Sequence, residues 1–502
     1  MVFQMSSLTS PEKTTVVKDE QGSKMKRVLT FDLLRGIAII GVVLFHVLNI
    51  AFSDKVDTIE AALEGGATVE LYWYILAPIL LVIGGFNGLF LMISAASNAI
   101  SVRKQWDRAL EKEKSEKQAF KDILASQTIR GVLIWVFGFI SESIIANGLS
   151  RWIESLTGET VKNFWIEMID GFYMWNILNT IGLCLIITSL IQLIYLRHKI
   201  DRKAISVILI IVTIACTMIL PLTREIVFET LGTDTFSNNW NTIPIDQQIL
   251  RLILVPFVGR LTPLIPFFSS ASAGLLISIN INDKSVTPGF LRKVLYSGLI
   301  FLAASFIVGI IFGIELGDRE RNIFYQMFTL GLEIIVIVYL LYMVDFRKKT
   351  RTKTFVKYTA WIRRFGIMTL TLWMLQYFMI FPVILIEAIT GWPIIEGGLN
   401  DPQLGIVLLL LFLMWHTILW VWEKANFKGS FEWLTSLVLS GGRSSGDRKR
   451  IDDLLYHSES MVDHVPERMI DPKEKALVII NIIFGALYAL IIVLVALGVL
   501  SL

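Results

Sequence analysis

The sequence predicts an all-α fold, a polytopic bundle of about eleven membrane-spanning helices, and three observations support it. Hydrophobic residues make up 54% of the 502 positions, charged residues only 18%, and the mean hydropathy is +0.64, which is far from an average soluble domain. The apolar residues form runs of about twenty, the length that crosses a bilayer as a helix. The loops between the runs alternate between basic and acidic composition, as the two sides of a membrane require.

The spans follow one another along the chain with polar breaks between them. We predict them at 29–52, 72–100, 127–149, 172–196, 203–222, 262–281, 293–315, 322–344, 364–390, 403–423 and 475–500. Two cysteines, Cys184 and Cys216, both lie in apolar runs, so the sequence offers neither a disulfide framework nor a cysteine metal cluster. The charged stretch Ser101–Gln127 alternates Glu with Lys at helical spacing, which predicts a helical extension outside the membrane.

The charges in the loops predict the orientation of the chain, because Lys and Arg concentrate on the cytoplasmic side. Basic residues precede the first span, an acidic loop follows it, and basic loops return at 103–130, 197–203, 284–293 and 347–357. We therefore expect a cytoplasmic N-terminus and an external C-terminus. The expected regions are a cytoplasmic tail at 1–28, a membrane core at 29–440, a cytoplasmic linker at 441–474 and an additional helix at 475–502.

The first span carries three ionisable residues, Asp32, Arg35 and His46. Such residues are costly inside a membrane and usually face a bundle interior or a watery cavity, so they indicate a functional site. Arg35 and His46 are eleven residues apart, close to three helical turns, which places them on one face at a separation of roughly 16 Å. Asp32 lies one turn before Arg35 and can pair with it.

This arrangement, an Arg and a His separated by ten residues within "D-x-L-R-G-x-A", resembles the opening motif of the acyltransferase-3 membrane proteins. The stretch is also similar to the heparan-alpha-glucosaminide N-acetyltransferase group and its prokaryotic relatives. Both resemblances imply transfer of an acyl group, commonly acetyl from acetyl-CoA, to a sugar. In the acyltransferase-3 branch the His at position 46 belongs to the active site. In the other branch the working His comes later, near the position where this chain has the acidic Asp57.

Residues of the second and third spans are candidates for the donor site. Gly85 and Asn87 belong to a glycine-rich segment that either permits close helix approach or forms a thin wall beside a cofactor channel; its pattern is similar to the one that frames the acyl-CoA path in the related proteins. Arg130 ends the third span, where it either reaches toward lipid headgroups or binds the cofactor. Glu142 lies deep in an apolar run and needs a partner there.

Four residues are candidates for binding the acceptor. Asn176 and Asn179 stand one turn apart at the start of the fourth span. Arg260 precedes a segment with two prolines, which disturb helical hydrogen bonding and are tolerated at membrane depth beside protein or a cavity. Gln376 lies in the ninth span, where "FGIMTLTLWMLQYFMIF" resembles a segment of the prokaryotic relatives, as does "WEKANFKGSFEW" after the tenth.

We therefore expect a multi-pass cell-membrane acyltransferase that moves an acetyl group from cytoplasmic acetyl-CoA to a sugar or glycan, outside or within the lipid bilayer. His46 is the expected base because an imidazole gains and loses a proton near neutral pH, with Glu142 and Asp57 as the next candidates. Arg35 is expected to bind cofactor phosphate. We expect no metal and no nucleic-acid partner, and a homo-oligomer stays open. A transporter of a small polar or anionic solute is the alternative, although such folds show repeated halves that we do not find.

Overall fold

The protein is described by a computed structural model that covers residues 28–51, 86–149, 175–231, 262–282, 288–312, 323–346, 353–394 and 401–440, with short pieces at 249–250, 253–254, 256–257, 399 and 455–456. The secondary structure within these ranges is helical, and they contain no strand. This confirms the predicted all-α class. Eight of the described helices are long and apolar enough to cross a membrane.

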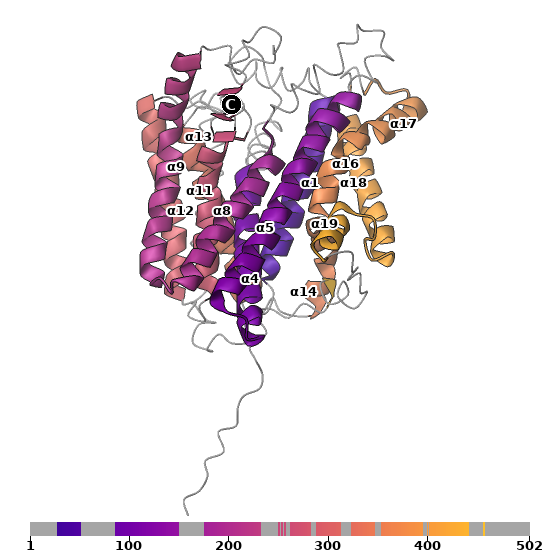
Figure 1. Ribbon diagram of the computed structural model, residues 1–502. Coiled ribbons are helices and arrows are strands. Elements are labelled where there is room, and N and C mark those ends of the chain that lie inside the picture. Colours follow the sequence, from indigo (N-terminus) through magenta and orange to yellow (C-terminus); the bar gives the residue numbers. More distant parts are fainter. Residues whose placement is uncertain are drawn as a thin grey trace, which may run out of the picture.

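The described helices overlap ten of the eleven predicted spans, although α4 continues well beyond the span predicted at 72–100 and the span predicted at 364–390 is divided among α15, α16, η6 and α17. Figure 1 shows the helices standing side by side as a bundle. In chain order they are α1 (Leu29–Ala51), α4 (Phe86–Glu111), α5 (Glu116–Phe139) continued by the π-helix η1 (Ile140–Ala146), α8 (Ile177–Arg197), α9 (Arg202–Leu231), α11 (Leu264–Asn282), α12 (Pro288–Phe312), α13 (Ile323–Leu340) continued by η4 (Leu341–Phe346), α14 (Lys353–Tyr358), α15 (Ala360–Ile367), α16 (Thr369–Leu375), the 3-10 helix η6 (Gln376–Met379), α17 (Ile380–Thr390), α18 (Asp401–Lys424) and α19 (Phe431–Leu439). The predicted span at 475–500 lies outside the described residues.

The predicted charged extension at 101–127 is a helical hairpin rather than one helix. A turn at Lys112–Ser115 separates α4 from α5, with Glu113 in the left-handed region at φ 58°. The Ser115 hydroxyl then accepts a hydrogen bond from the Gln118 backbone N–H at 3.2 Å and caps α5, which is the usual role of Ser before a helix. Alternating Glu and Lys predict helix well but leave the position of such a turn open.

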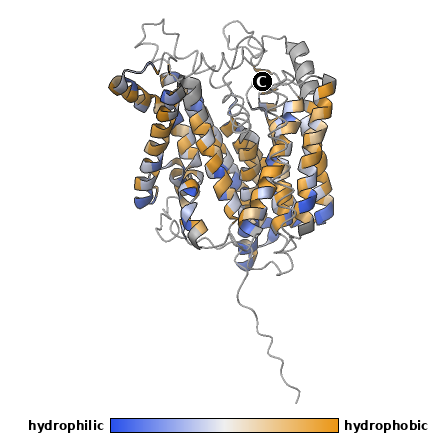
Figure 2. Ribbon diagram, turned by 180° about the vertical axis from the view of Figure 1, so that it is seen from behind, coloured by the Kyte–Doolittle hydropathy of each residue, from blue (hydrophilic) through white to orange (hydrophobic). Residues whose placement is uncertain are grey.

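The α4–α5 turn and the α8–α9 turn lie at the same end of the bundle, which we call the basic end. Lys199 Nζ is 3.4 Å from the Glu116 carboxylate, and the Arg197 guanidinium lies over the Phe120 ring at 5.3 Å from its centroid. This is the lower end in Figures 1 and 2, where Figure 2 shows hydrophilic residues gathering below largely hydrophobic helices. The pattern fits the predicted cytoplasmic side.

Apolar side chains cover the outward faces of several helices. On α9 the exposed residues are Val207, Ile208, Ile210, Ile211, Ile214 and Met218. A contiguous apolar surface of this kind needs an apolar solvent, since water-exposed surfaces rarely carry one. The polar side chains that matter for function are therefore expected between helices, where they are shielded from lipid.

Helix α1 is fixed at two places. At its start, the Leu29 and Thr30 backbone N–H groups donate to the two Asp345 carboxylate oxygens at 3.1 and 3.0 Å, and the Thr30 hydroxyl adds a bond of 2.6 Å. Nearly two turns further along α1, glycines let α1 and α15 touch. A Cβ on Gly36 would lie 2.1 Å from the Ile362 carbonyl oxygen, and one on Gly366 would lie 2.5 Å from that of Asp32. These contacts set the depth and rotation of the helix that carries Arg35 and His46.

Candidate active site

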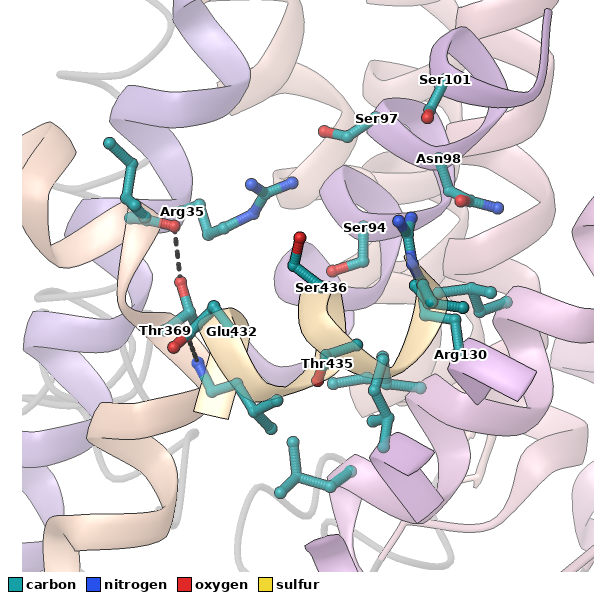
Figure 3. A pocket seen from close by; sticks show the side chains of 18 of the residues that line it. Arg35, Ser94, Ser97, Asn98, Ser101, Arg130, Thr369, Glu432, Thr435 and Ser436 are labelled. Carbon is teal, nitrogen blue, oxygen red and sulfur yellow. Dashed lines mark hydrogen bonds between the residues drawn. The ribbon is translucent and has the colours of Figure 1, made fainter. Parts of the chain in front are cut away.

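A pocket of about 600 Å³, lined by both polar and apolar side chains, lies between α1, α4, α5, α8, α15, α16 and α19, within the range of small-molecule sites. We call it the basic pocket, because Arg35 and Arg130 line it from two different helices. In Figure 3 both guanidinium groups extend toward the serines of α4. Since Gln105 and Ser126 belong to its lining, the pocket extends toward the basic end of the bundle.

Arg35 reaches the pocket from α1 and is oriented within its own helix. Its Nη1 lies 4.0 Å from Asp32 Oδ1, three residues earlier, as the spacing predicts. The Arg35 side chain keeps 22% of its surface exposed whereas that of Asp32 keeps 7%. The cation is therefore the more accessible member of the pair, and an anion that enters the pocket can reach it.

One face of α4 supplies five of the uncharged polar groups that line the pocket. Ser94, Ser97, Asn98, Ser101 and Gln105 all line the pocket, and from first to last they extend over roughly 16 Å of helix. Asn98 is 6% exposed and its Nδ2 donates to the Ser189 hydroxyl at 2.7 Å. That hydroxyl itself donates to the Leu185 carbonyl, which fixes the orientation of the amide. Asn98 Oδ1 is then a buried acceptor with no hydrogen-bond partner among the described residues.

The wall opposite α4 is built by α16 and α19, which bind each other through their N-termini. Glu432 Oε1 accepts hydrogen bonds from the Leu370 and Thr371 backbone N–H groups at 2.6 and 3.1 Å, and its Oε2 accepts from the Thr371 hydroxyl. The Phe431 N–H donates back to that hydroxyl at 2.9 Å. Carboxylates are favoured at helix N-termini. Sequence reasoning missed Glu432 as a site residue because its partners are about sixty positions earlier in the chain.

His46 lies further along α1, and the basic pocket and His46 share one residue, Trp373. The His46 ring is edge-on to the Trp373 ring at 5.9 Å between centroids and to the Tyr377 ring at 6.3 Å. His46 Nδ1 lies 2.9 Å from the Val42 carbonyl oxygen. A carbonyl only accepts hydrogen bonds, so Nδ1 carries the proton and the Nε2 lone pair is left as an acceptor. That is the tautomer a general base requires.

Glu142 extends this group of side chains from η1, the continuation of α5, and we call His46, Trp373, Tyr377 and Glu142 together the His46 cluster. The Tyr377 hydroxyl donates to Glu142 Oε2 at 2.7 Å, across 235 positions of sequence. Glu142 lies within the π-helix η1 and Tyr377 within the 3-10 helix η6. The chain therefore departs from α-helical geometry at both residues of this hydrogen bond. π-helical turns are frequent at functional sites. Glu142 thus has the partner that its position in an apolar run demanded.

Asn176 and Asn179 hold α8 in place. The Asn176 side chain accepts from the Asn179 N–H at 3.1 Å, and the Asn179 side chain accepts from the Asn176 N–H at 3.2 Å, which forms a capping box. Their amide nitrogens donate to α5 at the Gly138 and Trp135 carbonyl oxygens. The Asn176 side chain also lies beside the Glu142 carboxylate. The two residues therefore join α8 to α5 next to the cluster.

The remaining predicted site residues are described to different extents. Gln376 is buried, at 1% exposed, between Trp373 and Tyr377 along the chain. Asn87 belongs to the first turn of α4, but its side chain is not described. Gly85, Asp57 and Arg260 lie outside the described residues. Within the part of the chain that is described, no three His, Cys, Asp or Glu side chains gather as metal ligands would.

Comparison with known proteins gives one result. The family model of the acyltransferase-3 proteins, described as an acyltransferase domain, matches residues 28–423, well over half of the chain. The search of curated proteins and the search of solved structures found no match to this chain. The matched range contains the first-span motif with Arg35 and His46 and the Glu142–Tyr377 pair. It also contains every lining residue of the basic pocket except those of α19 and Ser440, which follow it in the chain. The chain therefore belongs to the acyltransferase-3 family and is a membrane acyltransferase.

Proposed function

We propose that this protein transfers an acetyl group from acetyl-CoA, bound in the basic pocket, to a hydroxyl or amine of a sugar held beside His46. The observation that carries the proposal is the position of Trp373. Its side chain is part of the pocket wall and contacts the His46 ring. A donor that enters from the basic end, with its thioester reaching Trp373, would deliver the acyl carbon next to an imidazole whose Nε2 can accept a proton.

The residues of the pocket fit such a donor. Coenzyme A carries phosphates at one end and a long arm with two amide groups. Arg35 and Arg130 suit the phosphates, since guanidinium groups bind phosphate through several hydrogen bonds at once. The hydroxyls of α4 suit the arm, and the unpaired Asn98 Oδ1 can accept from one of its amide N–H groups.

The transfer step needs a proton acceptor and a fixed geometry. His46 Nε2 takes the proton from the attacking hydroxyl or amine of the acceptor as the new bond to the acyl carbon forms. The C–S bond then breaks, and the proton passes from His46 to the departing thiolate, so free coenzyme A leaves. Positioned acid–base catalysis of this kind contributes about 10²–10⁴ in rate. We favour direct attack over an acyl-histidine intermediate because one base serves both halves of the step.

Equilibrium binding of acetyl-CoA to the purified protein tests the proposal. We expect Arg35→Ala to weaken binding by about tenfold or more, because charge-assisted hydrogen bonds to a partly buried phosphate contribute about 1.5–3 kcal/mol. The matched control is Arg103→Ala, since Arg103 is bound to Asp107 on α4 and does not line the pocket. Equal affinity of the two variants would remove Arg35 from the donor site, and absence of binding to the unmodified protein would refute the donor.

A further inference from the structure

Two adjacent arginines of α15 bind a segment of the chain that lies far beyond them in sequence. Arg363 Nη2 donates to the Leu455 carbonyl oxygen, and Arg364 Nη2 donates to the Tyr456 hydroxyl at 2.7 Å. Leu455 is fully buried in the main apolar core, and Tyr456 packs against that core. We call Leu455 and Tyr456 the C-terminal strap. Because the family match ends at residue 423, the strap lies outside the matched acyltransferase domain.

The strap closes a ring of three polar side chains at the end of α18. Arg364 Nε donates to Glu423 Oε2. The Tyr456 hydroxyl, which accepts from Arg364, donates to Glu423 Oε1 at 2.8 Å. The Arg364 and Glu423 side chains keep only 10% and 14% of their surface exposed. An ion pair so shielded from water depends on the hydrogen bonds that complete it, and Tyr456 supplies one to each partner.

Arg363 depends on the strap because its own charge has little access to solvent. It is 1% exposed, and its Nη2 also donates to the Val356 carbonyl oxygen of α14. A buried guanidinium needs acceptors for its N–H groups, since an unpaired buried charge is costly. The Leu455 carbonyl oxygen is one of those acceptors. The strap therefore stabilises the position of α15 through both of its arginines.

Helix α15 is also the helix that packs against α1 at the donor site. Gly366 follows Arg364 by two residues and lines the basic pocket. A Cβ on Gly366 would lie 2.5 Å from the Asp32 carbonyl oxygen of α1, and Arg35 follows Asp32 within one turn. A displacement of α15 would thus move both the wall of the pocket and the helix that carries its cation.

We propose that the C-terminal strap is a positioning element for the donor site, which holds α15 against α1 in the arrangement where Arg35 contacts the phosphates of acetyl-CoA. The inference rests on the proposed function and adds residues that set donor affinity from outside the pocket lining. Without the strap a smaller fraction of molecules has this arrangement, and the apparent dissociation constant rises as that fraction falls. Saturating donor selects the arranged molecules again, so kcat at saturation does not change.

Tyr456→Phe tests the strap, because it removes the hydroxyl and keeps the ring. We expect acetyl-CoA to bind about three- to tenfold more weakly, the scale of hydrogen bonds to charged groups. The KM for acetyl-CoA should rise similarly, with kcat within about twofold of the unmodified protein. Arg364→Lys keeps the charge but loses the planar fork that reaches both partners, and it should weaken binding by a similar factor. The matched control is Tyr358→Phe on α14, where the side chain is 73% exposed and affinity should not change.

A double-mutant cycle with Arg35→Ala distinguishes positioning from a general loss of stability. If the strap acts through Arg35, Tyr456→Phe weakens acetyl-CoA binding when Arg35 is present. In the Arg35→Ala background it should change the affinity by less than about twofold, because the cation that it positions is absent. Hydrogen exchange at residues 29–36 and 360–367 should be faster in Tyr456→Phe than in Tyr358→Phe, since both helices are less firmly held.

The outcomes separate the two proposals. Equal acetyl-CoA affinity of Tyr456→Phe and Tyr358→Phe would overturn the role of the strap alone. A loss of affinity by the same factor with and without Arg35 would also overturn it, because the strap would then not act through that residue. Failure of the unmodified protein to bind acetyl-CoA would overturn the proposed function and the positioning role with it.

Discussion

His46 owes its suitability as a base to its surroundings. The Val42 carbonyl holds the proton on Nδ1, and the rings of Trp373 and Tyr377 stand edge-on to the imidazole. Tyr377 is in turn held by Glu142. A chain of contacts from α5 through η6 to α1 thus limits the directions in which Nε2 can point, which matters because small misplacements of reacting groups cost large factors in rate.

The Glu142–Tyr377 hydrogen bond can be tested by a double-mutant cycle. Tyr377→Phe keeps the ring against His46 but leaves a buried carboxyl without its donor, which should lower the free energy of unfolding by about 1–3 kcal/mol. Adding Glu142→Leu removes both partners and should restore part of that loss. Thermal unfolding in detergent measures both. The control is Tyr296→Phe on α12, where the side chain is 57% exposed; a loss of equal size there would exclude a specific role for the pair.

At the scale of elements, the approach of α1 to α15 positions the first-span residues. Gly36 and Gly366 allow backbone contact between the two helices, and Arg35 directly precedes the first of them. The same α15–α16 segment then continues to Trp373 and Tyr377. The helix pair therefore fixes where α1, with both Arg35 and His46, lies relative to the segment that carries Trp373 and Tyr377.

Gly366→Ala tests this contact. The added methyl group would meet the Asp32 carbonyl at 2.5 Å, and since a backbone atom cannot move aside as a side chain can, we expect a loss of about 1–3 kcal/mol in stability. Acetyl-CoA affinity should fall as well, because Arg35 shifts with α1. The matched control is Gly405→Ala on α18, where a Cβ meets nothing within 4 Å and Ala favours the helix. Equal melting temperatures for the two variants would contradict the account.

The positions of most helices, and the residues that share one side of α1, are predictable from the sequence. Apolar runs of about twenty residues give the spans, because a bilayer demands that length, and the spacing of Asp32, Arg35 and His46 gives their shared side of α1. Three features are not predictable. The turn at Lys112–Ser115 interrupts a continuous helical pattern, and η1 and η6 follow no local sequence rule. The Glu142–Tyr377 and Glu432–Thr371 bonds join residues far apart in sequence, so only the packed bundle brings them together.

At the scale of the whole molecule, the proposed transfer requires a defined direction across the membrane. The basic pocket extends toward the end that carries the α4–α5 and α8–α9 turns, whereas His46 lies eleven residues beyond Arg35 along α1. With the basic end in the cytoplasm, the donor would enter from inside and the acceptor from outside or from the bilayer. One site could then modify an external sugar without releasing acetyl-CoA to that side.

Cysteine-accessibility labelling tests the direction. Single cysteines at positions 114 and 349 should react only with reagents that enter the cytoplasm, and those at 60 and 400 should react with reagents confined to the outside, because basic loops remain inside. The native Cys184 is buried and Cys216 half-buried, so replacement of both by serine gives a clean background. The reverse labelling pattern would contradict the proposed path of the donor.

The measurement closest to the central claim compares transfer and binding in His46→Ala. If His46 is the base, its loss should lower acetyl transfer about a hundredfold or more while the affinity for acetyl-CoA, which depends on the basic pocket, stays within about twofold of the unmodified protein. Both are measured on the same preparation, by coenzyme A release and by equilibrium binding. Near-normal transfer with normal binding would contradict the claim, because His46 would then only pack between Trp373 and Tyr377.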